Sequence, residues 1–380
     1  MELILTLDVG TTSVKACLFD RQLRQTALTS REYALQTRGV CAEAEAQVYL
    51  DAAAQCILAL PAEARAKVCA VALTTQGETL LCVDRQGKAL RPAIVWLDSR
   101  AEAQAARLAA ALDRQRFYER TGLPELSGAL PLAKLLWLRE QEPESWARTD
   151  KFLLLEDYLM LWLTGRAVTE KSLLTSTGYF DLQSDDYWDE ALALAELDRT
   201  RLPQALACGS IVGPVLPEVA EALELPASAC VVTGAMDQTA AALAAGCTRP
   251  GTLCETTGTA MVAAAFTAHP QFSEDHHVTI YRHAMPGAYL YLPISNTIGM
   301  SLRWFRDEFC RDLDGGYAAL DRLAEQVPPG AQGVTFLPGA SIPTICRRPP
   351  AAFTGCGCPA QELPAPVRFW RQRLSSCAIF

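Results

Sequence analysis

Apolar and polar residues alternate at the start of the chain, the pattern of a strand with one buried face. Residues 3–7 predict a first strand, residues 10–12 a small turn, and residues 14–19 a second strand. The same pattern of strand, polar turn and strand occurs again later in the chain, where strands predicted over 68–73 and 80–83 flank a polar segment. We therefore expect two places where a short polar turn lies between buried strands.

Helical periodicity follows and interleaves with these strands. It is clearest over residues 48–60, 100–112, 130–138 and 152–163. The last segment runs into Thr164 and Gly165, and glycine is the usual residue just beyond a helix end. Alternation of strands and helices favours the α/β class.

Two more strand and turn units lie in the second half of the chain. Residues 229–233 predict a strand that leads through a polar turn into an alanine-rich helix, and residues 251–262 place Thr and Gly between two apolar runs. The turn at 257–259 is similar to the one at 10–12, which suggests a duplicated domain. The boundary between the two copies would lie near 237–250.

Length, charge and cysteine content narrow the class of protein. A chain of 380 residues predicts two domains. With 34 Lys and Arg against 43 Asp and Glu, the net charge of −9 disfavours a nucleic-acid partner. The chain shows no apolar run of membrane-spanning length and no signal-peptide pattern, so we expect no membrane association and a cytoplasmic location. Without a secretory signal, the 14 cysteines are interpreted as free thiols rather than a disulfide framework.

The first polar turn is a candidate anion site. Small residues let a phosphate approach the backbone N–H groups, and Thr11 and Thr12 add hydroxyls beside Gly10. Asp8 before the turn is a candidate anchor for a hydrated metal, and Lys15 is a nearby cation. An ordinary hairpin turn without a ligand is the alternative interpretation.

Other polar residues also have two interpretations each. Asp237 at the start of a predicted helix suits a general base, but a carboxylate there also stabilises the helix dipole. Glu78 and Asp98 are either substrate contacts or solvated turn residues. Trp96 is either a wall of a binding site or a core residue.

Taken together, these segments resemble the FGGY family of carbohydrate kinases. The resemblance covers about residues 3–346 and preserves the order of the family's motifs. It rests on residues 8–20, 75–78, 95–100, 121–124, 163–169, 177–182, 233–238, 256–259, 299–304 and 336–339.

The resemblance implies a fold of two ribonuclease H-like, actin-type ATPase domains, with ATP and sugar meeting in the cleft between them. It places a sugar-binding and first phosphate domain at 1–243 and a nucleotide-binding domain, incomplete here, at 244–346. Residues 347–380 depart from the family pattern and form an aberrant, disordered tail. The partner implied is a small sugar or polyol, and a homodimer is compatible with the family.

The resemblance also implies roles for individual residues. Asp237 would be the general base, and Asp8 would hold Mg²⁺ through water. Nucleotide and phosphate contacts are implied for Gly10, Thr11, Thr12, Ser13, Lys15, Gly258, Thr259, Gly299 and Arg303. Substrate contacts are implied for Gln76, Gly77, Glu78, Trp96, Asp98 and Gln238.

The family's activity is ATP-dependent phosphorylation of a sugar or polyol hydroxyl, and a pentulose such as xylulose is the substrate we expect first. Gly77 falls where family members carry larger side chains, which predicts a roomier pocket. The alternative is a non-catalytic sugar-binding or regulatory protein that has lost ATP turnover.

The charge of the tail differs from that of the rest of the chain. Residues 347–380 hold five Arg, no Lys and a single acid, Glu362, whereas the whole chain is acidic. A shifted reading frame after Cys346 would produce such a change, and a natural disordered tail is the alternative.

Overall fold

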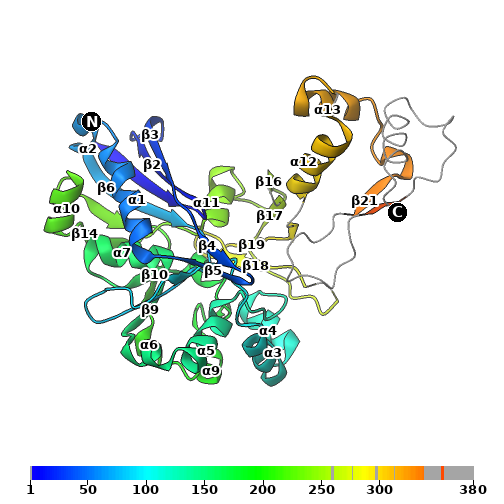
Figure 1. The fold of residues 1–380 in the computed structure, drawn as a ribbon. Coiled ribbons are helices and arrows are strands. Elements are labelled where there is room, and N and C mark those ends of the chain that lie inside the picture. The colour runs from blue at the N-terminus through cyan, green and yellow to red at the C-terminus, as the bar shows by residue number, and fades with distance from the viewer. Residues whose placement is uncertain are drawn as a thin grey trace. The chain divides into compact units, whose positions relative to one another are not determined.

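The computed structural model describes residues 2–257, 261–275, 277–295, 298–311, 313–337 and 352–354. The chain divides into two compact units (Figure 1). The first comprises Met1–Cys254 with Ala264–Leu292, and the second comprises Glu255–Ala263 with Pro293–Phe380. None of the helices described is long and apolar enough to cross a membrane.

A six-stranded sheet forms the centre of the first unit. Its strand order is β14 (Ile211–Pro214), β15 (Cys230–Val232), β6 (Val68–Thr75), β1 (Leu3–Val9), β2 (Ser13–Phe19) and β3 (Gln25–Glu32). Strands β15, β6 and β1 run parallel to one another, whereas β14, β2 and β3 pair antiparallel with their neighbours. The three parallel strands therefore end at one edge of the sheet.

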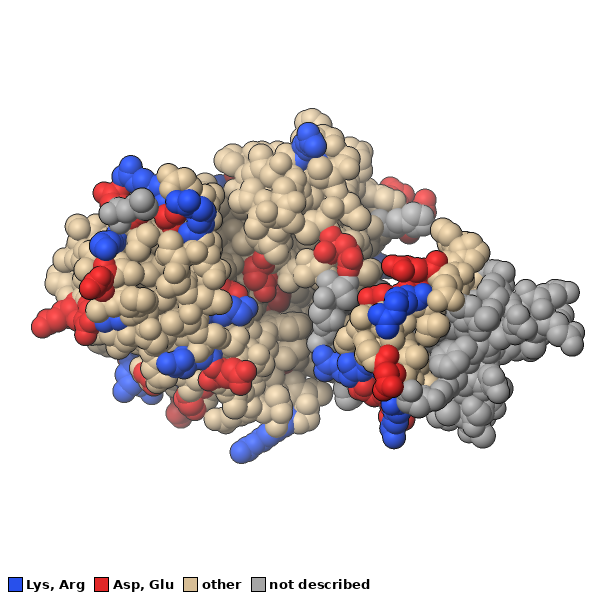
Figure 2. All heavy atoms as spheres, turned by 90° about the horizontal axis from the view of Figure 1, so that it is seen from above, with Lys and Arg blue, Asp and Glu red and all other residues tan. Residues whose placement is uncertain are grey.

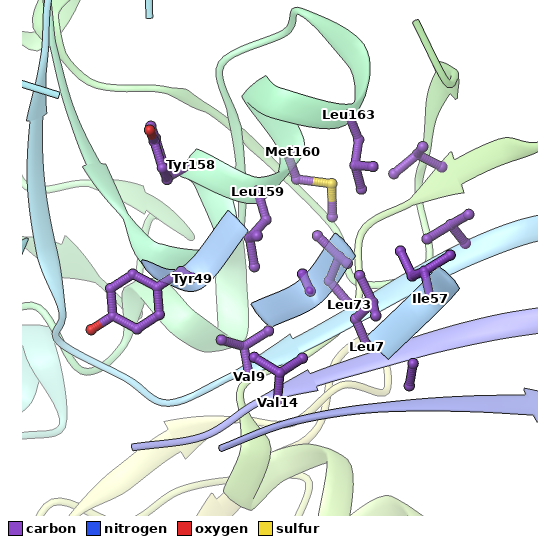
Figure 3. Close-up of a cluster of buried hydrophobic side chains, with 14 of the residues drawn as sticks. Leu7, Val9, Val14, Tyr49, Ile57, Leu73, Tyr158, Leu159, Met160 and Leu163 are labelled. Carbon is purple, nitrogen blue, oxygen red and sulfur yellow. The ribbon is translucent and has the colours of Figure 1, made fainter. Parts of the chain in front are cut away.

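Two helices supply the largest part of the core against this sheet. Helix α1 (Ala46–Leu58) packs on β2 and β3, and α7 (Leu155–Thr164) packs on β6, β14 and β15. Figure 3 shows Leu7, Val9, Val14 and Leu73 of the sheet meeting side chains of both helices. Every second residue of β1 is buried, as the alternating sequence pattern predicts.

A second sheet and a group of helices complete this unit. The sheet has the order β4 (Gln36–Arg38), β5 (Cys41–Ala44), β8 (Ala93–Ile94), β7 (Leu80–Val83) and β9 (Lys151–Leu154). Two small pairs are β10 (Val168–Glu170) with β13 (Gln204–Leu206) and β11 (Phe180–Asp181) with β12 (Asp186–Tyr187). The remaining helices are α2 (Ala62–Arg65), α3 (Glu102–Ala111), α4 (Arg114–Thr121), α5 (Pro131–Gln141), α6 (Pro143–Arg148), α8 (Lys171–Leu174), α9 (Asp189–Leu194), η1 (Arg199–Arg201), α10 (Pro217–Leu223) and α11 (Asp237–Ala244).

Residues 264–292 belong to the first unit, although the preceding residues 255–263 belong to the second. Here β17 (Met261–Thr267), β19 (Tyr289–Tyr291) and β18 (Ile280–Arg282) pair antiparallel. The end of α4 fixes β18, because Ile280 N donates to Gly122 O at 2.8 Å. Gly122 has φ +75°, and an added Cβ would lie 2.2 Å from the carbonyl oxygen of Ile280. Only glycine permits both this conformation and this approach.

The second unit has fewer described elements. They are β16 (Leu253–Thr257), which begins in the first unit, β20 (Ile294–Ser295), α12 (Ile298–Phe309), α13 (Gly316–Ala324), η2 (Ala331–Gly333), β21 (Thr335–Leu337) and β22 (Ala352–Thr354). Phe305, Phe309, Cys310 and Leu320 form its small apolar core. Within the tail predicted from residue 347, only β22 is described, and it pairs antiparallel with β21.

Most predicted elements of the first unit are confirmed, and one is corrected. The helix predicted over 152–163 begins only at Leu155, because Phe152–Leu154 belong to β9. Its predicted end is correct: Gly165 takes a left-handed conformation at φ +69°. Cysteines among the described residues are free, as predicted, and Cys56 and Cys82 are buried. Strands and helices interleave as the α/β prediction requires.

Candidate active site

The predicted catalytic and substrate segments meet where the three parallel strands end. Strand β1 leads into Gly10, β6 leads into Gln76, and β15 is followed by Asp237. Hydrogen bonds tie the segments together, since Gln76 N donates to Val9 O at 3.1 Å and Thr74 Oγ1 donates to Ala235 O at 2.7 Å. In open α/β sheets, ligands bind outside the carboxyl ends of the strands. This edge is the candidate active site.

The turn after β1 is held by its own backbone and by Tyr33. Gly10 N donates to Ser13 O at 3.0 Å, Tyr33 N donates to Thr12 O at 2.9 Å, and the Tyr33 hydroxyl donates to Gly10 O. Asp8 and Lys15 are cross-strand partners, and Lys15 Nζ lies 3.1 Å from Asp8 Oδ2. Both side chains are partly exposed, so a charged ligand can reach them.

Gln76 has an unusual environment for an amide side chain. It is 2% exposed, and neither its side-chain oxygen nor its nitrogen has a hydrogen-bond partner among the described residues. Buried polar groups are normally paired, and each unpaired one costs about 1–3 kcal/mol. The buried Tyr49 hydroxyl lies close enough to interact with this amide, so either Tyr49 or a bound molecule with hydroxyl groups could satisfy it.

Gly77 leaves little room for a side chain beside Gln76. An added Cβ would lie 3.3 Å from Ser176 Oγ and 3.5 Å from Met236 Sδ. Any larger residue here would press on the segment that precedes Asp237. The predicted roomier pocket stays a prediction.

Glu78 takes a left-handed backbone conformation, with φ +48°. Burial raises the pKa of its carboxyl to about 7, although Lys134 and the hydroxyls of Ser176 and Tyr281 oppose the shift. Asp237 lies close enough to add to it. Glu78 is half-buried, so it is not fully solvated, and its substrate role stays a prediction.

Trp96 and Asp98 lie in the segment that follows β8. Trp96 is 37% exposed, which excludes a core role, and its indole Nε1 donates to Thr11 Oγ1 at 2.9 Å. Asp98 is fully buried and accepts hydrogen bonds from Ala42 N at 2.6 Å and from the Arg100 guanidinium at 2.6 Å. Asp98 is thus not a solvated turn residue, and its oxygens already have protein partners.

Asp237 is the first residue of α11. Its Oδ1 accepts from Gln238 N at 2.6 Å. A carboxylate in the first turn of α11 also fits the stabilisation of the helix dipole considered from the sequence. Burial raises the pKa of the Asp237 carboxyl to about 6, and the charge of Asp8 adds to the shift. The carboxyl is therefore ionised near neutral pH and more basic than an ordinary aspartate. That combination suits a general base.

Buried groups fix the backbone that leads into Asp237. Met236 N donates to Glu170 Oε1 at 3.0 Å, and Gly234 N donates to Glu156 Oε1 at 3.0 Å. Both glutamates are buried, which raises their pKa values. Gly234 is required here, because an added Cβ would lie 1.3 Å from Leu73 O in the neighbouring strand.

Four predicted site residues are not connected to this edge by any described contact. Gln238, half-buried on α11, is connected to it through the bond from its backbone N–H to Asp237. Gly299 and Arg303 lie on α12 in the second unit. Gly258 and Thr259 lie outside the described residues. Their phosphate and substrate roles stay predictions.

The donor set at this edge fits magnesium. Asp8 and Asp237 supply carboxylate oxygens, and Mg²⁺ is commonly bound by one or two carboxylates with several waters and substrate phosphates. No group of three or more His, Cys, Asp or Glu capable of holding a metal occurs in the described part of the chain. The fit is thus to a hydrated, substrate-bound ion rather than to a cage of protein ligands.

Sequence reasoning missed three residues beside Glu78: Lys134, Ser176 and Tyr281. Lys134 carried a signal, because it stands alone among apolar residues in Leu130–Leu138. Such a position in a buried helix requires a partner for the charge. Ser176 and Tyr281 carried no comparable signal, since long-range contacts bring them to Glu78.

Comparison with known proteins gives a consistent result. The model of the N-terminal domain of the FGGY family of carbohydrate kinases matches residues 3–244. The chain is 30% identical to the xylulose kinase of Lactococcus lactis, over 89% of this chain and 67% of that protein. It is 27% identical to the gluconokinase of Bacillus subtilis, over 88% of this chain and 67% of that protein. The chain thus spans about two thirds of the length of these relatives.

A solved structure shows the same fold. The crystal structure of xylulose kinase from Rhodospirillum rubrum matches with a TM-score of 0.85 at 28% identity. The match covers 99% of this chain and 76% of that one. The predicted ribonuclease H-like, actin-type fold is confirmed by this similarity.

Proposed function

The chain belongs to the FGGY family of carbohydrate kinases, whose members are ATP-dependent phosphotransferases, and we propose that it phosphorylates a pentulose such as xylulose with Asp237 as the general base. One observation carries the assignment. The ends of β1, β6 and β15 bring a phosphate-type turn, a buried amide and a basic carboxylate to one edge of a sheet.

In the proposed step, the Asp237 carboxylate accepts the proton of a substrate hydroxyl while that oxygen attacks the γ-phosphorus of ATP. The bond between the γ-phosphorus and the β,γ-bridging oxygen breaks, and ADP leaves. Phosphoryl transfer depends mainly on positioning and charge stabilisation. Lys15 supplies positive charge, and the turn at Gly10, Thr11 and Thr12 supplies backbone and hydroxyl donors.

Magnesium supplies charge neutralisation for the ATP phosphates when it is bound. Asp8 would hold the ion through water. The pairing of Asp8 with Lys15 at 3.1 Å keeps this carboxylate in place beside the turn.

The substrate contacts proposed are those that surround the Gln76 amide. Gln76 and Glu78 offer hydrogen-bonding groups to several hydroxyls, and Trp96 offers an apolar face. The relatives include kinases named for xylulose and for gluconate, so the sugar itself must be established by measurement.

Replacement of Asp237 by asparagine tests the proposal. The Asp237→Asn variant should lose turnover by about 10²–10⁴, the usual contribution of a general base, while sugar affinity stays within a few-fold. A coupled ADP-release assay over xylulose, gluconate and glycerol, with calorimetry for binding, measures both quantities.

A matched control uses the same substitution at another helix start. Asp113 precedes α4 and accepts from Arg116 N at 2.8 Å, and asparagine caps helices as well as aspartate does. Asp113→Asn should leave turnover unchanged. Turnover within about threefold of the parent in Asp237→Asn would contradict the assignment.

The alternative to a kinase is the non-catalytic sugar-binding or regulatory protein considered from the sequence. A non-catalytic sugar-binding protein would bind a sugar in calorimetry and release no ADP. The same two measurements therefore separate the two functions.

A further inference from the structure

Lys134 is a fully buried cation in the middle of α5 that the proposed chemistry does not use. It is 0% exposed and ranks among the largest fully buried side chains of the described residues. Burying an ammonium group is costly unless the surroundings compensate for it. The contacts of Lys134 show where that compensation comes from.

The ammonium group bonds to backbone carbonyls of two different segments. Lys134 Nζ donates to Val95 O at 2.9 Å and to Glu78 O at 3.4 Å. Val95 directly precedes Trp96, and Glu78 closes the turn that begins at Gln76. Lys134 therefore joins the two segments that carry the proposed sugar contacts.

The carbonyl that Lys134 Nζ reaches at 3.4 Å belongs to a residue with an unusual backbone conformation. Glu78 holds φ +48°, a conformation that costs a residue with a side chain on the order of 1 kcal/mol or more. Such a conformation persists only where the surroundings fix it. A single long side chain from α5 reaches this carbonyl from inside the protein.

Charge links the same residues. Lys134 is surrounded by Glu78 and Asp98, which favour its charged form, and by Arg100, which opposes it. Burial lowers the pKa of the Lys134 ammonium to about 8. Asp98 is already paired with Arg100 at 2.6 Å, so Glu78 is the acid whose charge Lys134 has to balance.

We propose that Lys134 is a positioning residue of the sugar site, which holds the Gln76–Glu78 turn and the Val95–Trp96 segment at the spacing that one polyhydroxy substrate requires. This inference rests on the proposed sugar-binding function. Lys134 acts from behind the pocket, through the two carbonyls and through the charge of Glu78.

The test compares two substitutions in the same helix of the full chain. Lys134→Met keeps the length of an apolar side chain but removes the donors and the charge. Leu138→Ala, one turn later and also fully buried, removes core volume but neither a hydrogen-bond donor nor a charge. Both variants should lower the melting temperature, so the control accounts for general loss of packing.

The readout is the dissociation constant for the sugar that the wild-type chain binds best, measured by calorimetry well below both melting temperatures. We expect Lys134→Met to weaken binding at least tenfold and Leu138→Ala to change it less than twofold. Lys134→Gln, which keeps N–H donors without the charge, should fall between them. It also serves as the test if the methionine variant does not fold.

Three outcomes would overturn the inference. Binding by Lys134→Met within twofold of wild type would show that the two segments do not depend on Lys134. An equal loss in Leu138→Ala would show a packing effect only. A wild-type chain that binds none of xylulose, gluconate or glycerol would remove the proposed function and this inference together.

Discussion

The ionised form of the Glu78 carboxyl, at this edge of the sheet, is less favourable in the folded protein than it is in water. Burial raises its pKa from 4.5 to about 7, so the folded protein binds a proton more tightly than the unfolded chain does. The free energy of unfolding must therefore fall as the pH rises from about 4.5 to about 7. Lys134 has the opposite effect above pH 8. Its pKa is lowered in the folded protein, so the folded chain loses this proton at a lower pH than the unfolded chain, and the free energy of unfolding rises with pH.

Replacing Glu78 by glutamine should remove the first of these effects. Glu78→Gln should lose less stability than wild type between pH 5 and pH 7, by on the order of 1–3 kcal/mol. Urea unfolding at several pH values measures the difference. Asp157, with its pKa raised to about 8, titrates in both proteins and cancels in the comparison. Asp237 interacts with Glu78, so the substitution changes its titration as well and the measured difference belongs to the pair. Parallel pH profiles for the two proteins would show that Glu78 is not desolvated.

Single residues were predictable where the local sequence carries the chemistry. Asp8 and Gly10 could be identified because a strand followed by a small polar turn is a local pattern. The role of Tyr281 could not, because a separate strand far along the chain brings it to Glu78. Asp98 was singled out by its motif, but no local pattern indicated that the Arg100 guanidinium and the Ala42 amide occupy its oxygens.

Strands β6 and β15 approach each other closely where they pair. Their contact continues beyond the ladder, because Gly234 lies against the carbonyl of Leu73. This closeness sets the position of α11, which begins three residues later at Asp237. The position of α11, which carries the proposed base Asp237, therefore depends on Gly234 having no side chain.

A methyl group at residue 234 should separate the strands. Gly234→Ala would place Cβ 1.3 Å from Leu73 O, so we expect a loss of at least about 3 kcal/mol, the upper end of overpacking costs. Gly10→Ala is the control, since its Cβ would meet only Ser13 O at 3.6 Å. Chemical denaturation compares them, and similar stabilities would argue against the close approach.

Elements were predictable wherever one periodicity extends over the whole segment. The helix predicted over residues 48–60 is found as α1, which begins and ends two residues earlier, at Ala46 and Leu58. The helix prediction for residues 152–163 was wrong at its start. Phe152, Leu153 and Leu154 form a continuous apolar run, which fits a buried strand as well as a helix. These residues form a strand because β9 pairs with β7, which lies far away in the sequence.

At the scale of the molecule, the first unit is not one continuous stretch of chain. Residues 264–292 belong to it although residues 255–263 do not. This later stretch brings β18, whose Ile280 N bonds to Gly122 O at 2.8 Å, and it brings Tyr281 to Glu78. No feature of the sequence between 250 and 264 indicated such a return.

Truncation at two points would test this organisation. A chain that stops after Leu292 keeps the whole first unit and should retain sugar binding, whereas one that stops after Cys254 should lose it together with thermal stability. Calorimetry and a melting curve on both fragments provide the comparison. Equal sugar affinity in the two fragments would exclude a role for residues 264–292.

The hydrogen bond from Trp96 to Thr11 joins a proposed sugar contact to a proposed phosphate contact at 2.9 Å. A phosphate that draws Thr11 into a new bond must change the environment of the indole, and a sugar packed on the indole must change that of Thr11. Where one ligand alters the affinity of the other, thermodynamic linkage requires the same factor in both directions. The two substrates of this chain would bind as a cooperative pair, with one indole ring reporting on both.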